Sequence, residues 1–201
     1  VTDMLEKKGL FLAEVEIRVL IEEELSRQKA EEAEKNGKKV AVMDLDFRKP
    51  TIHKIFKTAN TFGIVEYILG ECSFEELVKK TEYGVDVFNR GKAASNASVI
   101  FMGEKFKALL EKLKRDYDVV LFDCPPVLQV SDYIHLAKLS SGVLFVVSCE
   151  KARRSQVKEA VSALKKAGAN VMGTAVTFSG KGGLGKNYGA YKNYTKYYGD
   201  Y

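Results

Sequence analysis

The sequence has no long hydrophobic run, few cysteines and no strong excess of either charge. None of its apolar segments reaches the roughly 18 residues that a membrane-spanning helix needs, and residues 1–9 are polar and mixed, unlike a secretory signal. The cysteines Cys72, Cys124 and Cys149 are far apart, which argues against a disulfide framework or structural zinc site and favours a reducing cytosol. With 32 basic and 27 acidic side chains the net charge is +5, which excludes a nucleic-acid-coating composition.

The middle of the chain alternates between two kinds of hydrophobic pattern. Hydrophobic residues make up 46% of the chain and charged residues 29%, proportions that suit one globular domain. Short valine-rich runs, typical of strands buried on both faces, lie at 40–43, 85–88, 119–122, 143–147 and 171–178. Helical patterns lie at 64–69, 74–80, 104–114 and 154–167. This alternation predicts an α/β fold with a mostly parallel sheet flanked by helices.

The two ends of the chain differ from this middle part. Residues 1–39 carry ten acidic and eight basic side chains. Within them, residues 13–21 fit either a helix or an alternating strand, and residues 27–36 fit an exposed helix. Residues 188–201 lack a core-like period, which predicts a flexible tail whose tyrosines could stack on a partner or accept phosphoryl groups. The six tyrosines of this tail are Tyr188, Tyr191, Tyr194, Tyr197, Tyr198 and Tyr201.

Two carboxylates and two cations follow the first valine-rich run, as Asp44, Asp46, Arg48 and Lys49. At strand spacing the two carboxylates point to the same side, just past the carboxyl end of the strand, where open α/β sheets bind ligands. Their hard oxygen atoms suit Mg²⁺, and the two basic side chains suit phosphate. From these residues alone, a polar turn with an exposed salt bridge is an equally valid interpretation.

Two further segments carry possible nucleotide chemistry. Asp123 ends a buried apolar run, which is the Walker B arrangement for holding Mg²⁺; a capping aspartate is the alternative. The segment from Lys181 to Lys186, Lys-Gly-Gly-Leu-Gly-Lys, resembles a deviant Walker A loop, with Asn187 in place of the usual Ser or Thr. Its glycine N–H groups could cradle phosphates and its lysines neutralise them. A flexible basic hinge is the alternative for this segment.

Together these motifs resemble the bacterial tyrosine kinases, or BY-kinases, of capsule and exopolysaccharide systems. The resemblance covers residues 37–178, including Asp-x-Asp-x-Arg-Lys-Pro at 44–50 and Asp-Cys-Pro-Pro at 123–126, and the tyrosine-rich end fits as well. It implies a P-loop NTPase-like α/β domain over residues 37–178. A helical or divergent segment, 1–36, would precede it, and a Gly/Lys hinge with the tyrosine tail, 179–201, would follow.

The resemblance also implies an activity, a site and partners. The family phosphorylates its own C-terminal tyrosines with ATP and Mg²⁺, so Asp44, Asp46 and Asp123 would be catalytic, the last two as metal ligands. The residues that would bind nucleotide phosphates are Arg48, Lys49, Lys181 and Lys186. The implied partners are a membrane-anchored polysaccharide co-polymerase, which recruits the protein from the cytoplasm to the inner face of the membrane, further copies of the chain, and a tyrosine phosphatase. Nucleic acid is not among them.

The segment before residue 37 departs from the family pattern. BY-kinases have a strand, a Gly-x-x-x-x-Gly-Lys-[Ser/Thr] loop and an apolar helix there, and residues 13–36 show none of the three. Without the loop, nucleotide phosphates lose their backbone cradle and principal lysine. A second interpretation is therefore a non-catalytic kinase-fold substrate or scaffold of the same export system. A third, a partition or division-site ATPase, shares the sheet but gives the tyrosine tail no role.

Overall fold

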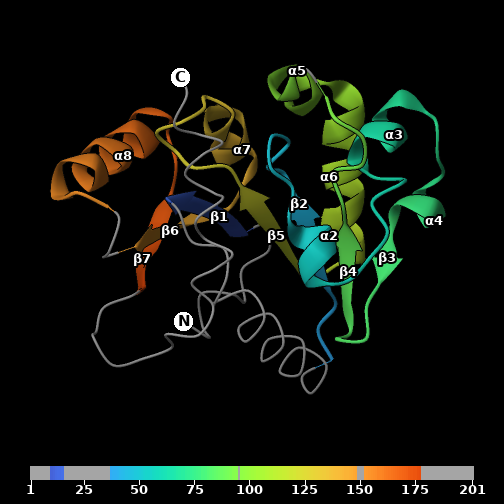
Figure 1. Cartoon of the computed structure of the whole chain (residues 1–201). Helices are drawn as coiled ribbons and strands as arrows, with labels where there is room; N and C mark the ends of the chain where they lie inside the picture. Colours follow the sequence, from blue (N-terminus) through green and yellow to red (C-terminus); the bar gives the residue numbers. More distant parts are fainter. Residues whose placement is uncertain (1–9, 16–36, 95, 149–151, 178–201) are drawn as a thin grey trace.

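The computed structural model describes residues 10–15, 37–94, 96–148 and 152–177 (Figure 1). Its strands are β1 Leu10–Val15, β2 Val40–Asp44, β3 Lys79–Lys80, β4 Val85–Phe88, β5 Val119–Cys124, β6 Gly142–Ser148 and β7 Val171–Thr177. Its helices are α2 Ile52–Ile55, α3 Ile64–Leu69, α4 Phe74–Leu77, α5 Ala97–Met102, α6 Glu104–Asp116, α7 Tyr133–Leu139 and α8 Arg154–Lys166. The strands form one sheet in the order β3-β4-β2-β5-β1-β6-β7, and only β3 runs antiparallel to its neighbour.

The predicted α/β architecture is confirmed, and all five valine-rich runs form strands, apart from Phe178, which lies outside the described residues. The predicted helix over 74–80 is wrong beyond Leu77. Val78 has extended backbone, and Lys79–Lys80 pair antiparallel with β4. The reason is tertiary, because the open edge of β4 offers these two residues backbone partners that no local pattern reveals. The short helices α2, α5 and α7 carried too few periodic positions to be predicted.

Successive residues of the central strands face two different hydrophobic clusters. Val40 and Val42 of β2 pack in the smaller cluster, together with Ile52 and Phe56 at α2. Their neighbours in β2 belong to the larger cluster, to which α5, α6, α7 and α8 all contribute buried side chains. Because both faces of these strands are covered, their sequences read as continuous rather than alternating apolar runs.

Strand β1 corrects an expectation about the N-terminal segment. Residues 13–21 fitted either a helix or a strand, and residues 13–36 showed no counterpart of the family's strand, yet Leu10–Val15 pairs in parallel with both β5 and β6. The sheet therefore extends into the part of the chain that was assigned to a separate segment, 1–36. Of the ambiguous stretch at 13–21, the described residues 13–15 are strand, and the remainder lies outside the described residues. A six-residue strand next to an unusual segment is hard to recognise locally because its partners lie more than a hundred residues away.

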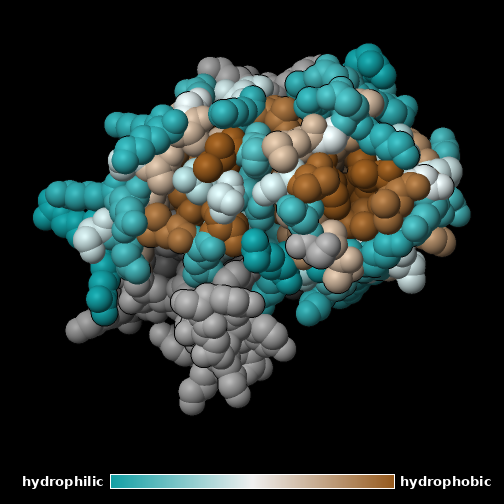
Figure 2. Space-filling view, turned by 90° about the horizontal axis from the view of Figure 1, so that it is seen from above, coloured by the Kyte–Doolittle hydropathy of each residue, from teal (hydrophilic) through white to brown (hydrophobic). Residues whose placement is uncertain are grey.

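The carboxyl ends of the parallel strands meet at one edge, towards which the arrowheads of β4 and β5 point at the top of Figure 1. The chain leaves β1 for β2 on one side of β5, and later returns to β6 on the other side of β1. Such a reversal of strand order is where open α/β sheets bind ligands. Figure 2 looks down from above, where hydrophobic side chains gather in areas within a hydrophilic rim. None of the helices in the described ranges is long and apolar enough to span a bilayer.

A buried glutamate fastens the loop that follows β4 at this edge. Glu66 of α3 accepts hydrogen bonds from the backbone N–H of Gly63 and of Lys92, both at 2.9 Å. Gly91 precedes Lys92 and has a positive φ of +85°. A Cβ atom at Gly91 would overlap Glu66 Oε2. Arg90 Nη1 in turn donates to the carbonyl of Phe47 at 2.9 Å. Arg90 therefore connects the loop that Glu66 fastens to the loop that follows β2.

We predict that Gly91→Ala destabilises the protein much more than Gly168→Ala. Gly168 also has positive φ, +77°, but a Cβ there meets nothing within 4 Å. Its substitution carries only the cost of left-handed backbone, about 1 kcal/mol. Gly91→Ala must in addition displace the Glu66 carboxylate from its two N–H donors, adding about 1–3 kcal/mol. Urea unfolding followed by circular dichroism measures both, and equal losses would show that Glu66 is not essential there.

Near the amino ends of β4 and β5, a buried tyrosine donates a hydrogen bond to an aspartate. The Tyr117 hydroxyl donates to Asp86 Oδ2 at 2.6 Å, and Lys80 Nζ lies 2.6 Å from the same oxygen. Burial, and then the hydrogen bond to Asp86, raise the pKa of Tyr117 well above its usual value. The phenol is therefore held in its protonated form in the folded protein.

This pair predicts a specific alkaline limit of stability. A pKa that is raised on folding contributes stability that is fully present below the unfolded value, about pH 10, and is lost as pH rises through the folded value. The unfolding free energy should therefore decline above about pH 10 in the wild type, and should decline less in Tyr117→Phe. Tyr133→Phe serves as the control and should keep the wild-type decline. Parallel alkaline curves for wild type and Tyr117→Phe would contradict the assignment.

Candidate functional site

Two buried aspartates lie side by side at the carboxyl edge. Asp44, the last residue of β2, pairs in register with Asp123 of β5, and Leu12 of β1 occupies the next place in the same row. The two aspartates are 0% and 7% exposed. Beyond the end of β2, Leu45 N–H donates to the Asp123 carbonyl at 2.8 Å. The structure thus brings together two of the three aspartates that the sequence singled out, on adjacent strands.

The loop after β2 is folded around its own carboxylates. Asp44 Oδ2 accepts hydrogen bonds from the N–H groups of Thr51, at 2.9 Å, and Ile52, at 3.0 Å. Asp46 Oδ1 accepts from the N–H groups of Arg48, at 3.0 Å, and of Lys49, at 2.8 Å. Both aspartates have no exposed surface. Because β2 ends at Asp44, the strand alternation expected to align the two carboxylates does not extend to Asp46, which organises a turn of its own.

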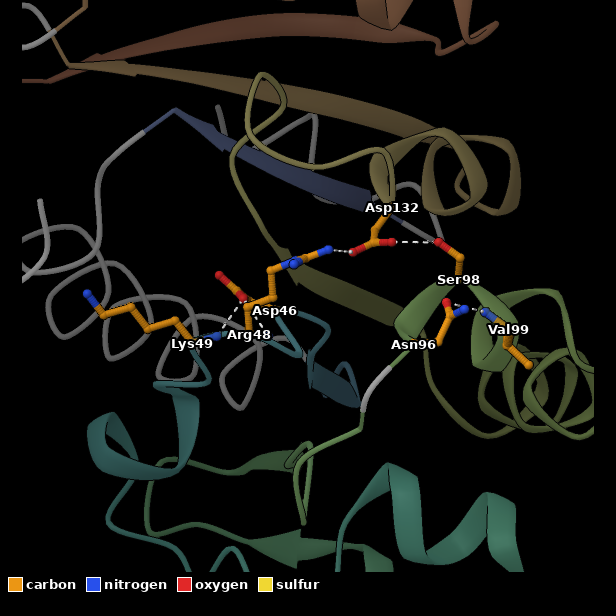
Figure 3. Close-up of polar contacts among 7 residues, drawn as sticks. All are labelled: Asp46, Arg48, Lys49, Asn96, Ser98, Val99 and Asp132. Carbon is orange, nitrogen blue, oxygen red and sulfur yellow. Dashed lines mark hydrogen bonds and ion pairs between the residues drawn. The ribbon is translucent and has the colours of Figure 1, made fainter. Parts of the chain in front are cut away.

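The two basic residues of this loop point in different directions. Figure 3 shows the side chain of Arg48 extending towards Asp132, while the side chain of Lys49 extends away from it. Arg48 Nη2 lies 3.8 Å from Asp132 Oδ2. Asp132 immediately precedes α7 and also accepts a hydrogen bond from Ser98 of α5. Asp132 and Ser98 thus link Arg48, a predicted phosphate ligand, to α7 and α5.

Three residues at this edge were not among the predicted site residues. Asp132 and Ser98 contact or support Arg48, and Arg90 contacts the carbonyl of Phe47. Arg90 could have been found, since it follows a buried valine-rich run just as Asp46 and Arg48 do. Ser98 could not, because an ordinary serine in a six-residue helix carries no local signal.

The remaining predicted site residues lie outside the described residues. They are Lys181, Lys186, Tyr188, Tyr191, Tyr194, Tyr197, Tyr198 and Tyr201.

The carboxylates at this edge fit a magnesium ion that takes its remaining ligands from water and phosphate oxygens. Mg²⁺ usually takes one or two protein carboxylates and fills its other positions with water and phosphate oxygens. Asp123 of β5, together with Asp44 and Asp46 at and after the end of the neighbouring strand β2, supplies carboxylates of this kind. Within the described ranges no group of three or more His, Cys, Asp or Glu could hold a metal by itself. A bound ion would therefore depend on ligands such as nucleotide phosphates.

The sequence that follows β1 does not fit a phosphate cradle. In a P-loop fold, glycine N–H groups and a lysine directly after this central strand surround the phosphates. Residues 16–36 contain no glycine, and they carry seven glutamates against four basic residues. Acidic side chains there would oppose an anion rather than attract it. Carboxylates suited to a metal ion thus lie at this edge, whereas residues 16–36 lack the glycines of a phosphate-binding loop.

Comparison with known proteins defines the class of this fold and then its family. The AAA domain family matches residues 25–171. The chain is 31% identical to the putative tyrosine-protein kinase CapB of Staphylococcus aureus, over 82% of this chain and 69% of that protein. It is 33% identical to the tyrosine-protein kinase YwqD of Bacillus subtilis (strain 168), over 68% of this chain and 58% of that protein.

Solved structures agree with these relatives. The chimerical protein CapA2B2 superposes with a TM-score of 0.76 at 26% identity, over 84% of this chain and 75% of that one. The septum site-determining protein MinD of Pyrococcus horikoshii, solved with Mg-ADP, shares the fold, with a TM-score of 0.64 at 18% identity over 84% of this chain and 69% of that one. The architecture is a P-loop NTPase-like α/β fold. The chain belongs to the bacterial tyrosine-protein kinase family.

The hydrogen bonds of Asp44 predict different effects for two substitutions. Asp44→Ala leaves the N–H groups of Thr51 and Ile52 without their acceptor, and should cost about 1–3 kcal/mol of unfolding free energy. Asp44→Asn keeps an acceptor oxygen and removes a negative charge beside Asp123, so it should stay within about 1 kcal/mol of the wild type. Urea unfolding at neutral pH measures both. A loss for Asp44→Asn as large as that for Asp44→Ala would show that the charge itself holds the loop.

Proposed function

We propose that this protein is an ATP-dependent protein-tyrosine kinase that phosphorylates its own chain and regulates capsular or exopolysaccharide synthesis and export. The observation that carries the proposal is the in-register pair of buried aspartates, Asp44 and Asp123, at the carboxyl edge beside β1. The names of the relatives CapB and YwqD support tyrosine as the substrate side chain. The chain spans 58% of the length of YwqD.

Each aspartate has a distinct role in this proposal. Asp44 orients the acceptor tyrosine hydroxyl and takes its proton, since a carboxylate held by two backbone N–H groups has a defined direction. Asp46 and Asp123 hold Mg²⁺ directly or through water. ATP supplies the phosphoryl group, and Mg²⁺ offsets the negative charge on its oxygens. Arg48, Lys49, Lys181 and Lys186 are proposed to contact the phosphates.

The acceptors are proposed to be the six tyrosines of residues 188–201. A kinase must draw its acceptor into an extended pose, and a segment spaced by glycine, asparagine and lysine loses little in adopting one. Tyr117 is a poor acceptor by contrast, because its hydroxyl is buried and donates to Asp86. Each phosphate adds about −1.5 to −2 charge, so several of them would outweigh the lysines of the tail and weaken contacts between copies.

The proposed partners follow from the same family. They are a membrane-anchored polysaccharide co-polymerase, further copies of this chain, and a tyrosine phosphatase. We place the protein in the cytoplasm, gathered at the inner face of the membrane by the co-polymerase. Cell fractionation with and without the co-polymerase tests this, and membrane retention in its absence would contradict it.

One observation favours a second function within the same system. The segment after β1 lacks the glycines and carries an excess of glutamates where the kinase fold needs a phosphate cradle. A chain of this kind could act as a substrate or scaffold that an active kinase phosphorylates. A partition or division-site ATPase ranks last, since its support is the shared fold of MinD, and it gives the six tyrosines no role.

Calorimetry with Mg-ATP separates the enzyme from the scaffold. Micromolar binding, about −8 kcal/mol, is expected for the kinase, whereas no binding at millimolar nucleotide is expected for the scaffold. Asp123→Asn should weaken binding by removing a proposed metal ligand. Asp118→Asn is the matched control, because Asp118 lies at the amino end of the same strand region and accepts a hydrogen bond from Lys39 N–H. An equal effect of both variants would contradict the assignment of Asp123.

Mass spectrometry of the purified chain after incubation with Mg-ATP then locates any phosphotyrosine. Phosphates on residues 188–201 that vanish in Asp44→Asn and persist in Asp118→Asn are the expected result, because Asp44 is the proposed base. Phosphorylation that survives Asp44→Asn would rule out this role for Asp44.

A further inference from the structure

Asp132 is a buried carboxylate at the carboxyl edge for which the proposed chemistry has no direct use. It precedes α7 and is 4% exposed. Its Oδ1 accepts a hydrogen bond from the Ser98 hydroxyl at 2.6 Å, and its Oδ2 lies 3.8 Å from Arg48 Nη2. Figure 3 shows Asp132 between the two, with Ser98 on one side and Arg48 on the other. Three separate parts of the chain, the loop after β2, α5 and the start of α7, therefore meet at one carboxylate.

Two neighbouring groups compensate the burial of the Asp132 carboxylate. A buried carboxylate is costly unless donors or a cation compensate it. Ser98 supplies a short hydrogen bond, and the guanidinium of Arg48 supplies the positive charge. In return, the carboxylate restrains a long side chain that would otherwise sample many rotamers.

Arg48 is held at both of its ends. Its backbone N–H donates to Asp46 Oδ1, and its guanidinium reaches Asp132. The side chain is nevertheless 59% exposed. A guanidinium has five N–H donors in a planar fork, and a contact through Nη2 leaves the other donors able to bind a second anion. The side chain of Lys49 extends the other way, away from Asp132 (Figure 3).

We propose that Asp132, steadied by Ser98, is a positioning residue that fixes the Arg48 guanidinium at the start of α7, so that its remaining N–H groups bind a phosphate group. This rests on the proposed function in that the phosphate would belong to the nucleotide or to a phosphotyrosine. The opposite arrangement, in which Asp132 competes with phosphate for Arg48, predicts an effect of the opposite sign. Substituting Asp132 therefore decides between them.

The first experiment measures the restraint without any ligand. The Nε–H resonance of Arg48, assigned by its loss in Arg48→Lys, should report an ordered side chain, with an order parameter above about 0.6. Asp132→Asn, which keeps an acceptor for Ser98 but loses the charge, should lower it below that value. Ser98→Ala should lower it less, and guards against misfolding of the first variant. A mobile Arg48 in the wild type would overturn the proposal.

The second experiment adds inorganic pyrophosphate as the phosphate probe and follows the same resonance. Saturation at millimolar pyrophosphate is expected in the wild type. Asp132→Asn should bind about threefold to tenfold more weakly, because Arg48 must then be ordered on binding. Asp118→Asn should match the wild type. Unchanged or tighter binding by Asp132→Asn, or an Arg48 signal that ignores pyrophosphate, would overturn the proposal.

These results separate the inference from the proposed function. An Arg48 that responds to pyrophosphate in a chain that does not bind Mg-ATP supports the positioning role and removes the kinase. A chain that binds Mg-ATP with no change at the Arg48 resonance keeps the kinase and overturns the positioning role.

Discussion

The loop that follows β2 is built around two buried carboxylates, and the geometry of the whole carboxyl edge depends on them. Asp44 and Asp46 together accept four hydrogen bonds, donated by the backbone N–H groups of Arg48, Lys49, Thr51 and Ile52. These contacts set where α2 begins and the direction in which the side chain of Arg48 leaves the backbone. The same loop is tied to β5 through Leu45 and to the loop after β4 through Arg90. The aspartates that the sequence predicts to be catalytic thus also stabilise the backbone of this loop.

Strand β1 reconciles two features that conflict in the sequence. Its parallel pairing with β5 and β6 keeps the sheet of the kinase family continuous, with Asp123 next to the central strand. Residues 16–36 nevertheless contain no glycine from which a phosphate cradle could be built. This edge therefore keeps two carboxylates suited to a metal ion, next to a sequence without the glycine N–H donors of a phosphate-binding loop. Kinase and scaffold differ in whether other cations replace those donors.

Arg48 is a cation of this edge that could bind phosphate in place of the missing glycine donors. Its charge is balanced by Asp132 from the start of α7, which Ser98 of α5 supports. A restrained guanidinium loses less conformational freedom on binding than a free one, so a single arginine can contribute more to phosphate affinity. Helices α5 and α7 would then influence nucleotide binding without either of them touching the nucleotide.

Sequence patterns determined the α/β class, the five valine-rich strands and the aspartates at their ends, because burial on both faces leaves a local signature of apolar runs followed by polar turns. Tertiary structure decided the place of β1, the change from helix to strand at Lys79, and the pairing of Asp132 with Arg48. Each of these depends on partners distant in sequence: two strands for β1, an open strand edge for Lys79, and one carboxylate for Arg48. Hydrogen bonds and ion pairs between distant residues carry no sequence period, so only the folded chain shows which groups satisfy one another.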